Sequence, residues 1–176
     1  MNSNGNTALI LAANNGHSSI IPILLQANAN VNAVNSDGNT ALISAAYNGH
    51  SSIIPILLQA NANVNAVDSY GYSSLIYAAR NGHESIVTEL IQHRANVNTT
   101  TTKEVTLSIN GNNVKCAIGT TALMCAAAGG RDGIVRTLIQ SNCDINLTNQ
   151  DNMNAIQFAQ KYNRNSTVTL LQQQRR

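Results

Sequence analysis

The chain repeats one pattern of apolar and polar positions. Small and apolar residues fill a short segment such as 8–13, an Asn-Gly-His stretch interrupts them, and a second apolar segment follows. In that second segment the aliphatic residues fall on one helical face, because residues three and four apart are neighbours on a helix; they are Ile20, Ile21, Leu24 and Leu25. Each unit therefore predicts a helix, a tight turn, a second helix and a polar loop.

The unit recurs every 33 residues, with one longer interval of 48 that contains an insertion of 15. The first five residues of the unit occur four times, as Gly5-Asn6-Thr7-Ala8-Leu9, Gly38-Asn39-Thr40-Ala41-Leu42, Gly71-Tyr72-Ser73-Ser74-Leu75 and Gly119-Thr120-Thr121-Ala122-Leu123. A decayed fifth copy begins near Asn152. One unit cannot bury its apolar face alone, so we expect the units to stack.

This repeat resembles the ankyrin repeat family, whose pattern runs roughly D-x-x-G-x-T-P-L-x-x-A-A-x-x-G-H-x-x-I-V-x-x-L-L-x-x-G-A-x-x-N. The second unit supplies, in that order, Gly38, Thr40-Ala41-Leu42, Ala45-Ala46, Gly49-His50, Ile53-Ile54, Leu57-Leu58 and Asn65. The resemblance implies an all-α solenoid of stacked helix-turn-helix units with β-turn fingers. We expect one domain over residues 1–176, divided into repeats at about 5–37, 38–70, 71–98 and 119–151, a capping unit at 152–174 and a hairpin insertion at 99–118.

The glycine that closes the second helix in the family pattern is replaced here by Asn28, Asn61, Arg94 and Asn142. Asparagine is the next-best residue for a left-handed position after a helix, so we expect these helix ends to persist. Arg94 fits that position less well. The Gly-His pair is the element with which the family joins the two helices of a unit.

The insertion has the alternation of a β-hairpin around Asn110-Gly111. A four-residue loop would place Ile109 opposite Val114, Leu107 opposite Cys116, and Val105 opposite Ile118, so that one face is apolar; these pairs are predictions. That face either folds back onto the neighbouring repeats as a staple or belongs to a protruding arm that contacts a partner.

The two ends of the array differ in polarity. Gln157, Gln160, Lys161 and the closing Gln-Arg run give the last unit the polar outer face of a terminal repeat. The first unit is nearly a copy of the second: residues 5–36 and 38–69 differ at three of 32 positions, Leu11/Ser44, Asn14/Tyr47 and Asn35/Asp68. We therefore expect a bare apolar edge at repeat one, covered by further repeats of a longer chain or by a second copy in a dimer; otherwise we expect a monomer.

Composition narrows the classes of function. A net charge of +2 gives too weak a field to favour nucleic acid, and no apolar run approaches the length of a membrane span. Asparagine is abundant, with 27 residues, which could indicate disorder, but the regular repeat argues for a folded chain. Three cysteines without C-x-x-C spacing suggest a reducing compartment. We expect an intracellular, cytoplasmic location; the alternative is a secreted effector that acts in a host cytoplasm.

Residues with catalytic or metal-binding chemistry do not converge in the predicted fold. His17, His50 and His83 lie one per layer, roughly 10 Å apart, so they cannot share one metal ion. Cys125 has no basic partner in its helix, and the carboxylates fall in turns and helix starts. We therefore expect no enzyme activity, no metal, no cofactor and no small-molecule substrate.

Recognition of a protein partner is the function that remains. The resemblance implies a concave binding face made of finger tips and first helices, and its variable positions here hold Ser44, Tyr47, Tyr70, Tyr72, Tyr77 and Arg80. Tyrosine and arginine are enriched in binding hot spots. We predict a non-catalytic protein-binding module centred on repeats two and three; the alternative is a targeting or regulatory segment of a larger enzyme or effector. Leu138 to Asn146 also resembles the Leu-x5-Asp-Ile-Asn pattern of asparaginyl hydroxylase substrates, with Asn146 as the acceptor.

Overall fold

The structure, a computed structural model, describes residues 2–109 and 112–174. Within these ranges the chain forms ten α-helices and two β-strands. In chain order they are α1 (Ala8–Asn14), α2 (Ile20–Gln26), α3 (Ala41–Asn48), α4 (Ile54–Gln59), α5 (Ser74–Asn81), α6 (Glu84–Gln92), β1 (Val105–Ile109), β2 (Asn112–Cys116), α7 (Ala122–Gly129), α8 (Asp132–Gln140), α9 (Ala155–Lys161) and α10 (Asn165–Gln173). None of the helices in the described ranges is long and apolar enough to cross a membrane.

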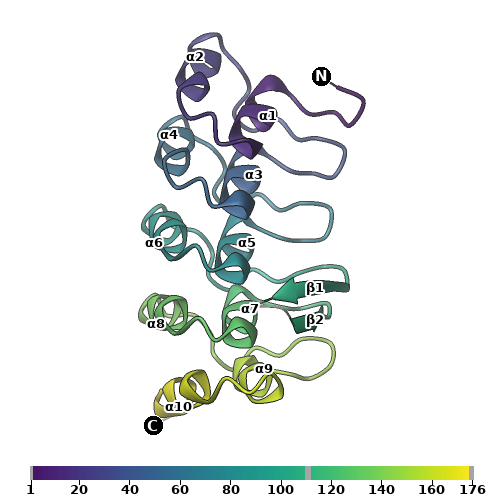
Figure 1. The fold of residues 1–176 in the computed structure, drawn as a ribbon, viewed down its shortest axis with the longest axis vertical. Coiled ribbons are helices and arrows are strands. Elements are labelled where there is room, and N and C mark those ends of the chain that lie inside the picture. The colour runs from purple at the N-terminus through teal and green to yellow at the C-terminus, as the bar shows by residue number, and fades with distance from the viewer. Residues whose placement is uncertain (1, 110–111, 175–176) are drawn as a thin grey trace.

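The helices form two parallel columns (Figure 1). The inner column consists of α1, α3, α5, α7 and α9, each packed on the next, and the outer column consists of α2, α4, α6, α8 and α10. The connecting loops, which we call the fingers, project from the inner column on the side away from the outer one. The predicted solenoid with one inserted hairpin is confirmed.

The inner helices begin at side-chain caps. The hydroxyls of Thr7, Thr40, Ser73 and Thr121 each accept a hydrogen bond from the backbone amide three residues on, which satisfies a donor that has no partner inside the helix. At the other end, Gly49 has φ 79°, and a Cβ there would lie 2.6 Å from His83 of the next repeat. Glycine is therefore required at this turn by both the backbone conformation and the close stacking of repeats.

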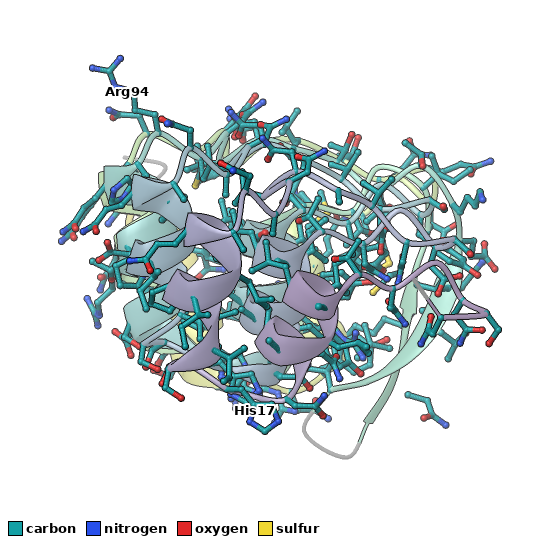
Figure 2. The ribbon with its side chains drawn as sticks, turned by 90° about the horizontal axis from the view of Figure 1, so that it is seen from above. His17 and Arg94 are labelled. Atoms are coloured by element: carbon teal, nitrogen blue, oxygen red, sulfur yellow. The ribbon has the colours of Figure 1, made fainter. Side chains whose placement is uncertain are left out.

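The outer helices end where the sequence predicts. Asn28, Asn61, Arg94 and Asn142 all have left-handed conformations, with φ of 59°, 63°, 64° and 58°. Arg94 adopts the same conformation as the three asparagines, and it projects from the side opposite His17 (Figure 2).

The Gly-His pairs connect the two helices of a unit: the His50 amide donates to the Ala45 carbonyl of α3, and the His50 carbonyl accepts from the Ile53 amide before α4. Their imidazole rings also join neighbouring repeats. His50 Nε2 lies 3.0 Å from the carbonyl oxygen of Asn14, and His83 Nε2 lies 3.3 Å from that of Tyr47. In each case the ring reaches back to the C-terminal end of the preceding inner helix, where carbonyl groups have no partner within their own helix.

The hairpin has a different register from the one predicted. Val105 pairs with Cys116, Leu107 with Val114 and Ile109 with Asn112, so the strands are shifted by two residues relative to the four-residue loop. Only residues 110 and 111 separate the strands, and this Asn-Gly dipeptide, which lies outside the described residues, is the type favoured in two-residue hairpin loops. A shift of two preserves which residues share a face, because strand side chains alternate with period two.

The apolar face of the hairpin folds back onto the repeats, which confirms the staple interpretation. Ile109, Val114 and Cys116 are at most 1% exposed and belong to the main core, although Ile118 is 42% exposed, contrary to the predicted continuous apolar face. Every residue of α7 is buried as well. The hairpin therefore covers the side of α7 that the neighbouring helices leave open.

The N-terminal edge of the array is bare, as the sequence predicts. Ile20 is 42% exposed, whereas its counterpart one repeat later, Ile53, is fully buried. Ile23 of the same helix is 61% exposed. A preceding repeat thus buries at repeat two a position that is open at repeat one, which is followed by a repeat but preceded by none among the described residues. At the other end the polar side chains of Gln157, Gln160 and Lys161 are exposed on the last unit. Arg175 and Arg176 lie outside the described residues.

Candidate partner-binding surface

The six predicted partner-binding residues come from two inner helices and one finger. Ser44 and Tyr47 lie on α3, Tyr77 and Arg80 lie on α5, and Tyr70 and Tyr72 lie in the finger that leads into α5. Three of the rings form one cluster. The Tyr47 and Tyr77 rings meet edge to face with centroids 5.2 Å apart, and Tyr72 stacks on Tyr77 at 5.0 Å. Both arrangements are favourable for aromatic pairs.

A buried carboxylate fixes this cluster to the finger. The hydroxyl of Tyr77 donates a hydrogen bond to Asp68 Oδ2 across 2.6 Å, while Asp68 Oδ1 accepts from the amides of Tyr70 and Tyr72. Burial, and then the hydrogen bond to Asp68, raise the pKa of Tyr77 above its ordinary value, so the phenol remains a donor well into the alkaline range. One carboxylate therefore sets both the turn of the finger and the position of a ring on α5.

The sequence suggested only a turn-forming role for Asp68. Its counterpart Asn35 accepts the equivalent turn bonds, from the amides of Asp37 and Asn39. Repeat two has a carboxylate at this position instead of an amide. Tyr77, nine residues later in repeat three, donates a hydrogen bond to that carboxylate. Asp68 and Tyr77 together are the signal that could have identified this contact.

The six predicted residues differ in exposure. Tyr47 is 44% and Tyr70 42% exposed, and Tyr77 and Arg80 are half-buried. Tyr72 is 2% exposed because its ring lies beneath Tyr77, and Ser44 is 8% exposed. Tyr72 and Ser44 thus support the surface from below and offer a partner little area of their own.

Two cations border the aromatic rings. Arg80 Cζ lies 5.8 Å from the centroid of the Tyr47 ring, and Lys103 Nζ lies 5.0 Å from that of Tyr70. Both distances fall within the range of cation–π attraction. Lys103 did not emerge from the sequence, because it belongs to the insertion and has no counterpart in the other repeats. We call Tyr47, Tyr70, Tyr77, Arg80 and Lys103 the tyrosine surface.

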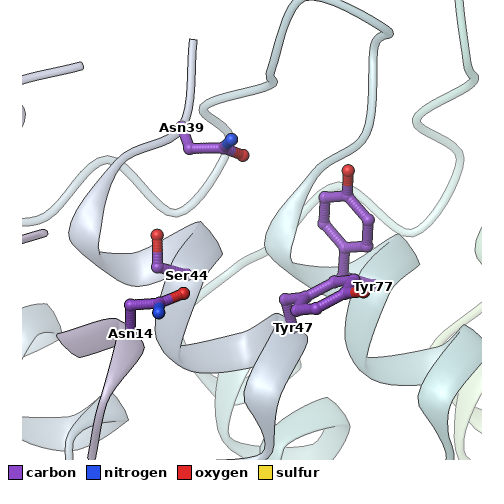
Figure 3. A pocket seen from close by; sticks show the side chains of 5 residues that line it. All are labelled: Asn14, Asn39, Ser44, Tyr47 and Tyr77. Carbon is purple, nitrogen blue, oxygen red and sulfur yellow. The ribbon is translucent and has the colours of Figure 1, made fainter. Parts of the chain in front are cut away.

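Two hollows flank Tyr77 on this surface. The first has a volume of about 270 Å³ and is lined by Asn14, Asn39, Ser44, Tyr47 and Tyr77 (Figure 3). The second has a volume of about 290 Å³ and is lined by Tyr70, Tyr72, Tyr77, Val105 and Thr106. The second hollow thus lies between the finger, α5 and the start of β1, and the hairpin forms one of its walls.

The inner helices beneath the surface are held in place across repeats. Asn81 Nδ2 donates to the carbonyl oxygen of Tyr47 at 2.7 Å, and Asn48 Nδ2 donates to Asn14 Oδ1 at 3.0 Å. These bonds join α5 to α3 and α3 to α1. They fix Tyr47 between its neighbours, so its exposed ring is presented by a rigid backbone.

The remaining candidate groups lie elsewhere. Cys116 and Cys125 are buried where the hairpin meets α7, and burial raises the pKa of the half-buried Cys143 to about 11. Across residues 2–109 and 112–174, no three His, Cys, Asp or Glu side chains are grouped so that they could hold a metal ion. Asn146 is exposed in the loop after α8, and its backbone N–H donates to Asp144 Oδ1.

Comparison with known proteins supports the interpretation of the repeat. A family model described as ankyrin repeats (3 copies) matches residues 1–68, 27–101 and 102–175, which together span nearly the whole chain. No curated protein matches the chain.

Proposed function

The chain belongs to the ankyrin repeat family, whose repeats generally mediate protein–protein interaction, and we propose that it binds a protein partner through the tyrosine surface. The observation that carries the proposal is the edge-to-face pair of Tyr47 and Tyr77, in which Tyr47 stays 44% exposed. Exposed aromatic rings that are already ordered lose little entropy on binding, and tyrosine and arginine dominate hot spots.

The rest of the inner-helix side supports a site centred on α3 and α5. Over α7 the hairpin occupies that side, and Cys125, Ala128 and Gly129 are buried beneath it. A partner that approaches the inner helices therefore meets α3 and α5 before it meets α7.

The proposed activity is binding without catalysis, since ankyrin repeat proteins are typically non-catalytic interaction modules. We place it in a reducing, intracellular setting, and most simply in the cytoplasm, because the three cysteines of the chain are free thiols and two of them are buried. We also retain Asn146 as the acceptor of a hydroxyl group. Incubation with an asparaginyl hydroxylase should add the mass of one oxygen to the peptide that contains Asn146, and an unchanged mass removes this assignment.

A second candidate function is that of a targeting or regulatory segment in a larger protein. The exposed aliphatic positions of α2, Ile20 and Ile23, favour it, because further repeats would cover them. The full-length open reading frame decides this: additional repeats or a catalytic domain before or after this chain support it, and a frame that encodes nothing beyond this chain contradicts it.

A cross-linked pull-down from a cell lysate tests the main proposal. The double variant Tyr47→Ala/Tyr70→Ala removes the two most exposed rings, and Ile20→Ala/Ile23→Ala removes two exposed aliphatic side chains on the outer helix α2 as a matched control. A partner retained by the wild type and the control but lost by the tyrosine variant supports the proposal. Equal capture by all three chains moves the binding site away from the tyrosine surface.

A further inference from the structure

Each strand of the hairpin has an outer edge that pairs with no other strand among the described residues, and the edge of β1 is the one on the α5 side (Figure 1). The sheet contains only β1 and β2, so β1 has a neighbour on one side only. In an antiparallel pair, alternate residues direct their N–H and C=O groups toward the partner strand and away from it. Ile109 and Asn112 close the two-residue connection as a hydrogen-bonded pair, so counting back by three places the N–H and C=O of Thr106 on the open edge. No described group outside the two strands hydrogen-bonds to the backbone of Thr106.

This open edge faces the tyrosine surface. Val105 and Thr106 form one wall of the second hollow, and Tyr70, Tyr72 and Tyr77 form the others. Figure 1 shows β1 on the α5 side of the hairpin and β2 on the side of the following finger. The edge that a third strand would occupy therefore lies over α5 rather than over α7.

β1 runs lengthwise beside the inner helices. At its start, the amides of Thr102 and Lys103 donate to the carbonyl oxygen of Tyr70 in the finger. At its end, Ile109 lies against Gly129, the last residue of α7; a Cβ on that glycine would be 3.3 Å from Ile109 Cγ2. Figure 2 shows the strands extending down along the inner helices toward the side where His17 lies. A strand added to β1 would thus pass first over Tyr77 and then over Arg80, one helical turn later.

The charges along this path favour an acidic partner. Arg80 and Lys103 border it, and neither has a carboxylate within 4.0 Å among the described residues. The Nε of Arg80 is buried without a hydrogen-bond partner in the same part of the chain. The one carboxylate in the cluster, Asp68, is buried and already accepts three hydrogen bonds. Arg80 as a whole is only half-buried, so the rest of its guanidinium can donate to an incoming carboxylate, which would be stabilised there.

We propose that the partner presents an extended segment that adds a third strand to the open edge of β1, with an apolar side chain in the hollow beside Tyr77 and an acidic side chain two residues away toward Arg80. Side chains at positions i and i+2 of a strand lie on one face about 6.6 Å apart, and Tyr77 and Arg80 are about 4.5 Å apart along the axis of α5, a difference of about 2 Å that the long arginine side chain spans. Backbone pairing gives affinity and the two inward side chains give selectivity. This inference rests on the proposed function, since it names the kind of partner that the tyrosine surface takes.

A displayed library of random ten-residue peptides, selected against the full chain, tests the inference. The enriched sequences should share an apolar and an acidic residue two positions apart. The tightest peptide is then synthesised with a single N-methyl group at each position in turn. Alternate positions should weaken binding by about tenfold or more, because N-methylation removes the donor that faces β1, and the intervening positions should tolerate it.

A protein variant provides the reciprocal test. Thr106→Pro removes the outward N–H without removing a bond to β2, and proline is tolerated on edge strands. Thr106→Val keeps the N–H and is the matched control. Peptide binding should fall about tenfold in Thr106→Pro and persist in Thr106→Val, with both chains melting like the wild type. If Thr106→Pro unfolds the hairpin, the N-methyl series still tests strand addition, because binding should be weakened at every second peptide position.

The outcomes separate this inference from the proposed function. Strand addition is overturned if peptide binding is lost in Tyr47→Ala/Tyr70→Ala but is unchanged by Thr106→Pro and by N-methylation. That result leaves the tyrosine surface as the binding site. A selection that enriches no peptide also overturns the inference, whereas the pull-down with folded partners judges the proposed function independently. The inference is also overturned if the wild type sediments as a dimer and Thr106→Pro sediments as a monomer, because a second copy of the chain would then occupy the edge of β1.

Discussion

The hydroxyl of Tyr77 on α5 donates to the carboxylate of Asp68 in the preceding finger, across 2.6 Å, and Asp68 in turn accepts the amides of Tyr70 and Tyr72. The finger and the inner helix are therefore joined at the point where the predicted binding residues meet. Because Asp68 is only 7% exposed, these donors take the place of the water molecules that an exposed carboxylate would bind.

This contact predicts a large difference between two similar substitutions. Tyr77→Phe removes a hydrogen bond to a charged group and should lower the free energy of unfolding by about 1.5–3 kcal/mol. Tyr47→Phe is the control, since no described group hydrogen-bonds to the Tyr47 hydroxyl. Urea denaturation of both variants measures the difference. Combining Tyr77→Phe with Asp68→Asn should cost less than the sum of the single changes, and strict additivity would show that the two side chains are not coupled.

Alkaline pH should destabilise the chain. Burial raises the pKa of Tyr72 and of Tyr77 above the ordinary value near 10, and the hydrogen bond to Asp68 adds to the effect at Tyr77. Both phenols are then neutral in the folded chain at a pH where they ionise in the unfolded chain. Their contribution is complete below about pH 10 and decreases as pH rises above it. Burial of Cys143, whose pKa rises to about 11, adds a decline that begins near pH 9.

Thermal melts between pH 8 and 11 measure this dependence. The melting temperature should hold to about pH 9 and then fall. The fall should be shallower in Tyr77→Phe, which removes one ionising group, than in the wild type. Parallel curves for the two chains would contradict the assignment to Tyr77.

A row of asparagine side chains connects the loops of successive repeats. The side-chain oxygens of Asn32, Asn65 and Asn98 accept hydrogen bonds from the amides of Asn63, Asn96 and Asp144, at 2.7, 2.8 and 2.8 Å. Asn65→Ala should therefore lower the free energy of unfolding by about 1 kcal/mol, and Asn65→Asp, which keeps the acceptor, should cost less. Ser52→Ala, at an exposed position with no hydrogen bond from a described group, is the control. Equal denaturation midpoints for Asn65→Ala and Ser52→Ala would contradict this role.

The hairpin offers two isoleucines with opposite exposure. Ile109 is 1% exposed and Ile118 is 42% exposed. Ile109→Ala should cost about 2–5 kcal/mol through lost burial and the resulting cavity, whereas Ile118→Ala should change stability by about 0.5 kcal/mol or less. Chemical denaturation of the two variants checks the staple directly, because a hairpin that did not pack on α7 would make the two losses similar.

Much of the fold follows from the sequence because each local signal repeats. The Thr or Ser before each of the first four inner helices caps it, and the asparagines after the outer helices tolerate the left-handed backbone, so helix ends could be predicted from single residues. The hairpin register could not be fixed in this way, since an Asn-Gly-Asn-Asn run is compatible with two loop lengths that differ only in pairing, and both place the same residues inside.

The site was harder to predict than the fold, because exposure depends on the third dimension. Tyr70 and Tyr72 are two residues apart in one finger, yet one is 42% and the other 2% exposed. Asp68 turns the chain between them and the hairpin closes over the side of Tyr72, and neither effect can be read from the repeat pattern. Lys103 joins the surface for a similar reason, since the insertion has no equivalent in the other repeats.

The central claim is that the exposed rings of Tyr47 and Tyr70 bind the partner, and the most direct test is a calorimetric titration of the purified partner into three chains. The wild type and Ile20→Ala/Ile23→Ala should bind with equal affinity, and Tyr47→Ala/Tyr70→Ala should bind at least about tenfold more weakly, since each hot-spot ring contributes more than about 1 kcal/mol. Equal affinity for all three chains, with unchanged melting temperatures, would contradict the claim.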